Sequence, residues 1–96
     1  KTACSLITAG GSADAYQPEG LNRHTVRQLL APVEQTFRLC GLRVLAPYAI
    51  LGANRMTEGD IEAAASAYGT ALIRLVEGEI DLEAAEQAEL LNEVLA

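Results

Sequence analysis

The chain has 96 residues, of which 50% are hydrophobic and 21% are charged, so its length suits one small globular domain. Its net charge of −6 argues against a nucleic-acid-binding protein, which would carry a basic stripe, and we expect no nucleic-acid partner. Residues 1–52 hold three acids and five bases, whereas residues 53–96 hold ten acids and two bases. The acidic second half is typical of a solvated surface, and a docking face for a basic partner is the alternative.

No apolar run approaches the about 20 residues of a membrane span, and no signal-peptide pattern is present, so we expect a cytoplasmic protein. The cysteines, Cys4 and Cys40, have neither a metal-ligand spacing nor that of a C-x-x-C redox pair. We therefore expect two buried free thiols in a reducing compartment and no metal site. The chain has no initiator methionine and enters an apolar run at once, which indicates a piece of a longer chain.

The first predicted element is a strand over residues 2–7, whose mostly apolar sequence is typical of a parallel strand covered on both faces. It ends at Gly10 and Gly11, where the backbone can turn sharply and a flat ligand can approach the main chain. Open α/β sheets bind ligands just beyond the carboxyl ends of their strands. An ordinary strand-to-loop turn is the alternative interpretation of the two glycines.

Residues 12–24 are predicted to form a long polar loop with one aromatic residue, Tyr16. Long loops are often binding loops, although a lone loop tyrosine can simply be a packing residue. Thr25 caps a helical turn over residues 25–30, and Pro32 begins the main helix, over residues 31–39, which ends at Gly41. One apolar stripe follows these helices: Val26, Leu29, Leu30, Val33, Phe37 and Cys40.

A second strand is predicted over residues 42–46, with residues 48–51 as its candidate continuation beyond Pro47. The proline places this strand at a sheet edge or bends it. A strand, a helix and a strand over this length predict a parallel crossover. Because two strands alone are marginally stable, we expect the rest of the sheet to come from a longer chain, a partner or copies of this chain.

The next predicted helix begins at Thr57, which forms a capping box with Asp60, and ends at Gly78. Its expected buried stripe consists of Ile61, Ala64, Ala65, Tyr68, Ala71, Leu72, Leu75 and Val76. Asp81 then caps a last amphipathic helix over residues 81–96, which covers either its own domain or another subunit. The predicted order is therefore β-α-β-α-α.

These motifs resemble, in their order, the C-terminal half of the flavodoxin-like NAD(P)H quinone oxidoreductases. The family has a T-T-G-G turn after its fourth strand, here Thr8-Ala9-Gly10-Gly11, followed by an aromatic, here Tyr16. A glycine-led segment follows, here Gly20-Leu21-Asn22-Arg23, and then a helix that ends in Cys40-Gly41 and a strand that contains Pro47. Within the family, the chain most resembles the ancillary oxidoreductases of glutathione-regulated potassium-efflux systems.

The resemblance covers about residues 1–77, and residues 81–96 fall outside it. It implies a doubly wound parallel sheet, with residues 1–78 as its last β-α-β-α portion and residues 79–96 as an amphipathic helical extension. It also implies a flavoprotein, with FMN or FAD, that takes hydride from NADH or NADPH and reduces quinone-like electrophiles in ping-pong order.

In the family, main-chain groups of the turn lie along the flavin ring, which assigns Thr8, Ala9, Gly10 and Gly11 to cofactor binding. The resemblance places Tyr16 beside the flavin, where its hydroxyl can donate a hydrogen bond to a substrate oxygen. Tyr16 and Asn22 are thus the candidate catalytic residues. Quinone reductases have a histidine, a candidate proton relay, where this chain has Asn22, and asparagine cannot transfer protons. His24 is either a substitute for it or an ordinary surface residue.

The resemblance further implies a homodimer and, in the potassium-efflux branch, a partner in the cytosolic domain of a transporter, which would hold the protein at the inner membrane. The family's phosphate-binding loop and the loop after its third strand are not in these residues, so we expect this chain alone to bind flavin poorly. Three functions stay open: an enzyme, a subunit that activates a transporter, and an inactive fragment.

Overall fold

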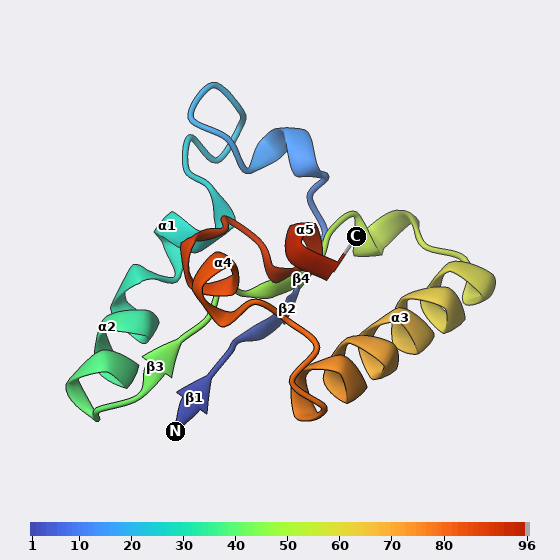
Figure 1. Ribbon diagram of the computed structural model, residues 1–96. Coiled ribbons are helices and arrows are strands. Elements are labelled where there is room, and N and C mark those ends of the chain that lie inside the picture. The colour runs from blue at the N-terminus through green and yellow to red at the C-terminus, as the bar shows by residue number, and fades with distance from the viewer. Residues whose placement is uncertain (96) are drawn as a thin grey trace.

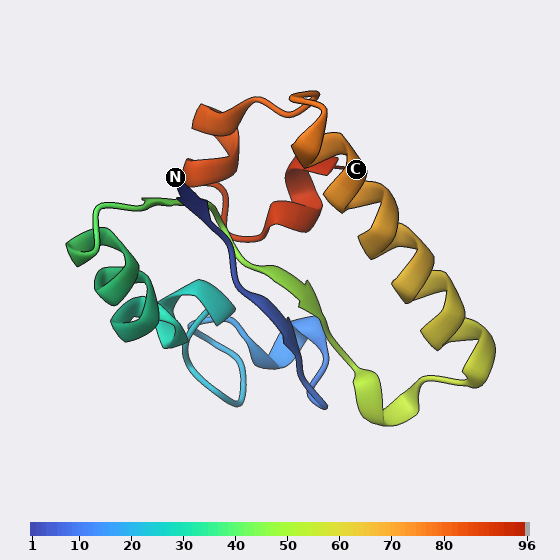
Figure 2. The same cartoon turned by 90° about the horizontal axis from the view of Figure 1, so that it is seen from below.

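The computed structural model describes residues 1–95 and has the parallel strands that the sequence predicts (Figure 1). Strand β1 (Thr2–Ala3) pairs in parallel with β3 (Arg43–Val44), and β2 (Leu6–Thr8) pairs in parallel with β4 (Tyr48–Ile50). Helices α1 (Val26–Leu29) and α2 (Ala31–Leu39) form the crossover between them, and α3 (Glu58–Val76) follows β4. Figure 2 shows the strands side by side, with α1 and α2 on one side and α3 on the other.

The predicted first strand, residues 2–7, is divided into two short strands, because its partner bends at Pro47. The N–H of Leu45 and that of Tyr48 both point toward the first strand, where they donate to Ala3 and Ser5. Between them, Ala46 N–H and Pro47 C=O both bond on the side away from the first strand. The backbone groups of this segment therefore do not alternate regularly between the two sides, as they do in an unbroken strand. Proline has no N–H to restore the ladder at this point.

The two helix starts predicted at threonine caps are confirmed. Thr25 Oγ1 accepts a hydrogen bond from Gln28 N–H, and the Gln28 side chain accepts one from Thr25 N–H. Thr57 and Asp60 form the same reciprocal pair at the start of α3. These bonds satisfy N–H groups that the first turn of a helix leaves without partners.

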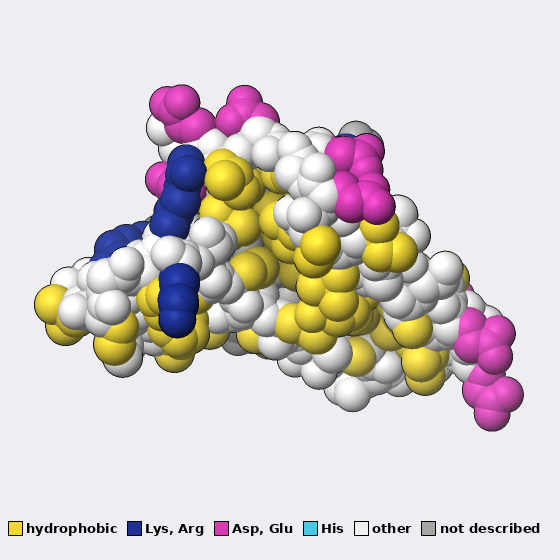
Figure 3. Space-filling model, turned by 60° about the horizontal axis from the view of Figure 1, so that its bottom comes forward, with side chains coloured by type: hydrophobic (Ala, Val, Ile, Leu, Met, Phe, Trp, Pro, Cys, Tyr) yellow, Lys and Arg dark blue, Asp and Glu magenta, His cyan; other side chains and the backbone are white. Residues whose placement is uncertain are grey.

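The predicted buried stripe of α3 is only partly buried. Ala71 is buried and Tyr68 packs against Tyr48, with ring centroids 5.4 Å apart, whereas Ile61 is 55% exposed and Leu72 is 43% exposed. The physical reason is the narrow sheet, since two strands do not reach across the apolar side of a long helix. Figure 3 shows hydrophobic side chains gathered in the notch beside α3. The same lack of cover leaves Leu6 of β2 45% exposed, although both faces of that strand were expected to be covered.

The prediction of a single last helix over residues 81–96 is wrong, because two short helices, α4 (Leu82–Gln87) and α5 (Leu91–Leu95), take its place. Asp81 caps α4 as predicted, accepting hydrogen bonds from the N–H groups of Glu83 and Ala84. We call residues 79–95 the C-terminal extension. It packs on its own domain: Ile80, Ala85 and Leu91 are buried in one core with Leu45, Ala46 and Tyr48.

The C-terminal extension covers the outer edge of the chain's second strand. Ala46 N–H donates to Ala85 C=O at 2.8 Å, and Leu91 N–H donates to Pro47 C=O at 2.8 Å. The side-chain amide of Asn92 accepts from Ala49 N–H at 3.0 Å and donates to Ala49 C=O at 2.8 Å. An uncovered edge would present these groups to other chains. The helix pattern breaks between α4 and α5 because the extension follows this bent edge.

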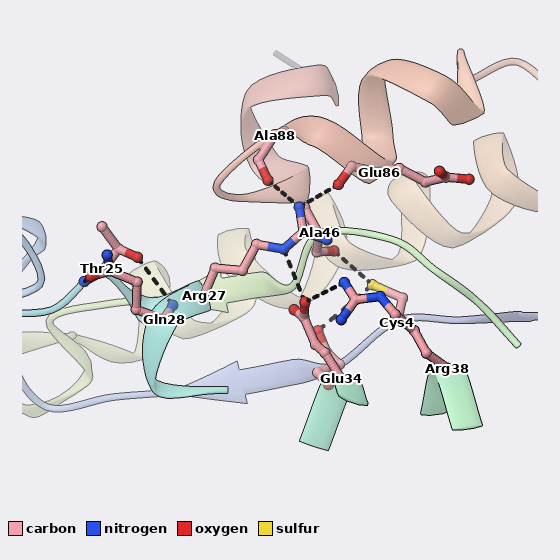
Figure 4. Close-up of polar contacts among 10 residues, drawn as sticks. Cys4, Thr25, Arg27, Gln28, Glu34, Arg38, Ala46, Glu86 and Ala88 are labelled. Carbon is pink, nitrogen blue, oxygen red and sulfur yellow. Dashed lines mark hydrogen bonds and ion pairs between the residues drawn. The ribbon is translucent and has the colours of Figure 1, made fainter. Parts of the chain in front are cut away.

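Arg27 joins α1, α2 and the C-terminal extension (Figure 4). Its Nε donates to Glu34 Oε1 at 3.1 Å, and its Nη1 donates to the carbonyl oxygens of Glu86 and Ala88. Arg38 Nη2 lies 3.4 Å from the same Glu34 oxygen. Glu34 is only 4% exposed, so the two guanidinium groups compensate a buried carboxylate.

The predicted apolar stripe of the first helices is corrected in part. Val26 is buried as predicted, whereas Leu29 is 50% exposed and Val33 is 43% exposed, and the acid Glu34 takes the buried position on α2. The side that faces the core is thus set by the ion pair with Arg27 rather than by hydrophobicity alone.

Neither cysteine is fully buried, which corrects the prediction. Cys4 and Cys40 are free thiols in exposed positions. The half-buried sulfur of Cys4 donates a hydrogen bond to Ala46 C=O at 3.2 Å. Desolvation raises the pKa of the Cys4 thiol above its ordinary value, which lowers the fraction of reactive thiolate at neutral pH.

Candidate functional site

The turn Thr8–Gly11 lies at the carboxyl ends of β2 and β4, as the sequence predicts for a ligand site. Three main-chain hydrogen bonds join it to β4 and the following loop: Ala9 N–H to Ile50 C=O at 3.0 Å, Ala53 N–H to Ala9 C=O at 2.9 Å, and Gly52 N–H to Gly11 C=O at 2.8 Å. The main chain of the turn is therefore fixed against the end of β4 and the loop that follows it.

Two main-chain donors of the turn have no acceptor in the described part of the chain. Within residues 1–95, neither Gly10 N–H nor Gly11 N–H donates a hydrogen bond to a protein atom. Backbone N–H groups at such positions commonly orient a bound small molecule. The turn can therefore donate to acceptor atoms at the edge of a flat ligand.

The space above the two glycines is partly taken by side chains of this chain. A Cβ at Gly10 would lie 2.3 Å from Asn54 Nδ2, and a Cβ at Gly11 would lie 3.2 Å from Cε2 of the Tyr16 ring. Asn54 was not predicted as a site residue, because a polar residue after a strand looks like an ordinary loop former. The signal that identifies it is topological, since the loops after neighbouring parallel strands meet at one edge of the sheet.

The loop over residues 12–24 folds back on itself and brings Tyr16 and Asn22 into one compact unit. Asn22 N–H donates to Ala15 C=O at 2.9 Å, and Gly20 N–H donates to Gln17 C=O at 2.9 Å. A Cβ at Gly20 would lie 2.2 Å from the backbone oxygen of Asp14, so this close approach requires glycine.

Asn22 and His24 are both exposed at the end of this loop. His24 Nδ1 lies 3.0 Å from Asn22 C=O, so the ring contacts the backbone of Asn22. Arg23 between them has a φ of +58°, in the left-handed region that side chains rarely adopt. The catalytic roles of Tyr16 and Asn22 stay predictions.

The predicted site residues face two separate hollows. Tyr16 lines a cavity of about 250 Å³ between the loop, the start of α1 and the C-terminal extension; its walls are Ala13, Tyr16, Gln17, Thr25, Val26, Leu51, Glu89, Leu90 and Glu93. Thr8 instead lines an apolar groove of about 350 Å³ beside α3, with Ile50, Met56 and Tyr68 among its walls. The structure thus brings Gly11 and Tyr16 into contact but places Thr8 on the opposite side of the turn from the Tyr16 cavity.

Comparison with known proteins defines the class. Residues 1–72 match the family model described as the flavodoxin-like fold, and the chain belongs to this family. It is similar to the glutathione-regulated potassium-efflux system ancillary protein KefG of Pectobacterium carotovorum, with 37% identity over 65 residues, which are 68% of this chain and 36% of that protein. General stress protein 14 of Bacillus subtilis is 34% identical over 55 residues, which are 57% of this chain and 31% of that protein.

The chain spans about a third of the length of the curated relatives that it matches. No solved structure matches the chain with comparable significance. The fold class and the family resemblance predicted from the sequence are confirmed. Among the helices of residues 1–95, none has the length and hydrophobicity needed to cross a membrane.

Proposed function

We propose that this chain is part of a flavin-dependent NAD(P)H oxidoreductase, in which the turn Thr8–Gly11 holds the flavin ring and Tyr16 lies beside it. The observation that carries this proposal is the pair of free N–H donors at Gly10 and Gly11, at the carboxyl end of a parallel strand. The edge of a flavin ring has carbonyl oxygens and ring nitrogens that accept such bonds, so the residues fit FMN or FAD. The family to which the chain belongs generally binds flavin.

When bound, the flavin would take a hydride from NADH or NADPH and pass it to an acceptor of quinone-like chemistry. The protein's own contribution is to bind and orient. Gly10 and Gly11 would donate hydrogen bonds to the ring edge, and the Tyr16 hydroxyl would donate one to the acceptor oxygen as negative charge develops there. The nicotinamide and the acceptor would use the same site one after the other, so the reaction would follow ping-pong order. Asn22 is exposed and is not among the residues that line the Tyr16 cavity, and its side chain cannot relay a proton.

We place the second wall of the flavin site in polypeptide outside residues 1–96. The apolar groove beside Thr8 and the half-covered face of α3 support this placement, because further strands of the sheet would cover both. Among residues 1–95, β2 pairs with β4 alone, so one edge of β2 is available for another strand. Within the same proposal the intact protein is a cytoplasmic homodimer, and residues 1–96 alone bind flavin poorly.

A regulatory role is the second candidate function. The relatives named KefG are described as ancillary proteins of a glutathione-regulated potassium-efflux system. The exposed acids of the C-terminal extension, such as Glu79 and Glu83, would offer a face to a basic cytosolic domain of such a transporter at the inner membrane. Co-purification with such a domain distinguishes this role from catalysis alone.

The substitution Gly10→Val in the intact protein tests the flavin site. A valine there displaces only the flexible side chain of Asn54, so the fold tolerates it, but the added methyl groups hold the ring away from the turn. We expect FMN affinity, followed by the quenching of flavin fluorescence, to fall about tenfold or more. Gly69→Ala, in open space on α3, is the control and should leave FMN affinity unchanged. Unchanged FMN affinity in Gly10→Val would show that the ring does not lie against this turn.

A further inference from the structure

The C-terminal extension lies outside residues 1–72, which match the family, yet it forms part of the wall of the Tyr16 cavity. Building on the proposed function, we propose that this cavity is the acceptor site and that Glu89 and Glu93 of the extension restrict it to acceptors without negative charge. The C-terminal extension would then help to determine which acceptors bind.

The body of the cavity is apolar and suits a small flat ring. Val26, Leu51 and Leu90 line it together with the ring of Tyr16, and its volume is about 250 Å³. Small-molecule sites commonly combine such walls with a few polar groups that fix orientation. The Tyr16 hydroxyl lies beside Gly11, and in this proposal it donates a hydrogen bond to an acceptor oxygen.

The charge at the cavity comes from two carboxylates. Glu89 and Glu93 both line it and are both exposed to solvent. Within residues 1–95, neither of them forms an ion pair, whereas the nearby Glu86 pairs with Arg43. Their charges therefore act on whatever enters, and they disfavour a carboxylate or sulfonate while they favour an amidinium. A cation would gain further from the face of the Tyr16 ring.

Hydrogen bonds of neighbouring residues fix the main chain that carries Glu89 and Glu93. The carbonyl oxygen of Ala88 accepts from Arg27 Nη1 at 2.5 Å, immediately before Glu89. The Asn92 side chain bonds to both main-chain groups of Ala49, immediately before Glu93. Leu91 lies between the two glutamates in the chain, and its N–H donates to Pro47 C=O at 2.8 Å. The main chain that carries the two charges is therefore fixed beside the cavity.

The test compares three probes of one shape and different charge: benzamidinium, benzamide and benzoate. Each is titrated into the intact protein with labelled tyrosines, and the ring resonances of Tyr16 are followed by NMR, with Tyr48 and Tyr68 as internal references. We expect benzamidinium to shift Tyr16 and to bind about tenfold more tightly than benzoate at low salt. The double variant E89Q/E93Q should remove this difference and leave benzamide binding unchanged. Glu83→Gln, an exposed acid of α4 outside the cavity, should retain it.

The proposal is overturned if benzoate binds as tightly as benzamidinium, if no probe shifts Tyr16, or if Glu83→Gln has the effect of E89Q/E93Q. These probes need no flavin, so their failure is separate from a failure to bind FMN. In the flavin-loaded protein, E89Q/E93Q should raise kcat/KM for anthraquinone-2-sulfonate relative to uncharged duroquinone. Charge-selective probe binding without this change in kcat/KM would refute the assignment of the cavity to the acceptor.

Discussion

Gly20 has no room for a side chain, because a Cβ there would lie within 3.0 Å of the backbone of Asp14 and Ala15. The turn that it permits closes the loop on which Tyr16 and Asn22 lie. The local signals of the sequence were sufficient to identify the helix caps. Thr25 and Thr57 were identified as caps because a cap bonds only three residues ahead. Glu34 was not identified as buried, because Arg27, which compensates it, is itself held by carbonyls 59 and 61 residues away.

Gly20→Ala should destabilise the protein, since its methyl group would lie 2.2 Å from a backbone oxygen that cannot rotate away. We expect the free energy of unfolding, measured by urea denaturation, to fall by about 1–3 kcal/mol. The matched control is Gly69→Ala, whose methyl group meets nothing within 4 Å and lies within the helix α3. There the better helix propensity of alanine should raise the free energy of unfolding by about 1 kcal/mol. Equal stability of the two variants would contradict the packing of the loop.

At the scale of elements, the C-terminal extension shows what a sequence pattern can predict. Its apolar spacing indicated a helix, and Asp81 correctly marked where that helix begins. The break into α4 and α5 was not predicted, because it depends on bonds to a strand 43 residues earlier in the chain, such as that between Asn92 and Ala49. The pairing of the strands was predicted to be parallel, because a crossover helix leaves few other arrangements.

Asn92→Ala should loosen the cover on the edge of β4. It removes an acceptor for Ala49 N–H and a donor for Ala49 C=O, and we expect a loss of about 1–3 kcal/mol in the free energy of unfolding. Hydrogen exchange of the Ala49 amide should become faster. Asn92→Asp is the informative companion, because it keeps the acceptor for Ala49 N–H and should protect that amide better than alanine does. If Ala49 exchanges at the same rate in all three proteins, the extension does not cover this edge in solution.

For the whole molecule, the main feature is the contrast between its two edges. The C-terminal extension closes the β4 edge, whereas β2 and the apolar side of α3 remain open. The sequence predicted this incompleteness, because two strands alone make a marginally stable sheet. It could not predict that Thr8 and Tyr16 face separate hollows, since this depends on where the extension packs.

The central claim is that Thr8–Gly11 and Tyr16 form one wall of a flavin site in a family member that transfers hydride. The most direct measurement is the absorbance of the intact protein with FMN, in the absence of oxygen, on addition of NADH or NADPH and then of duroquinone. The account predicts that the protein retains FMN through gel filtration, that NADH or NADPH bleaches the flavin band, and that duroquinone restores it. A folded intact protein that retains neither FMN nor FAD, or whose bound flavin neither nicotinamide reduces, would contradict the account.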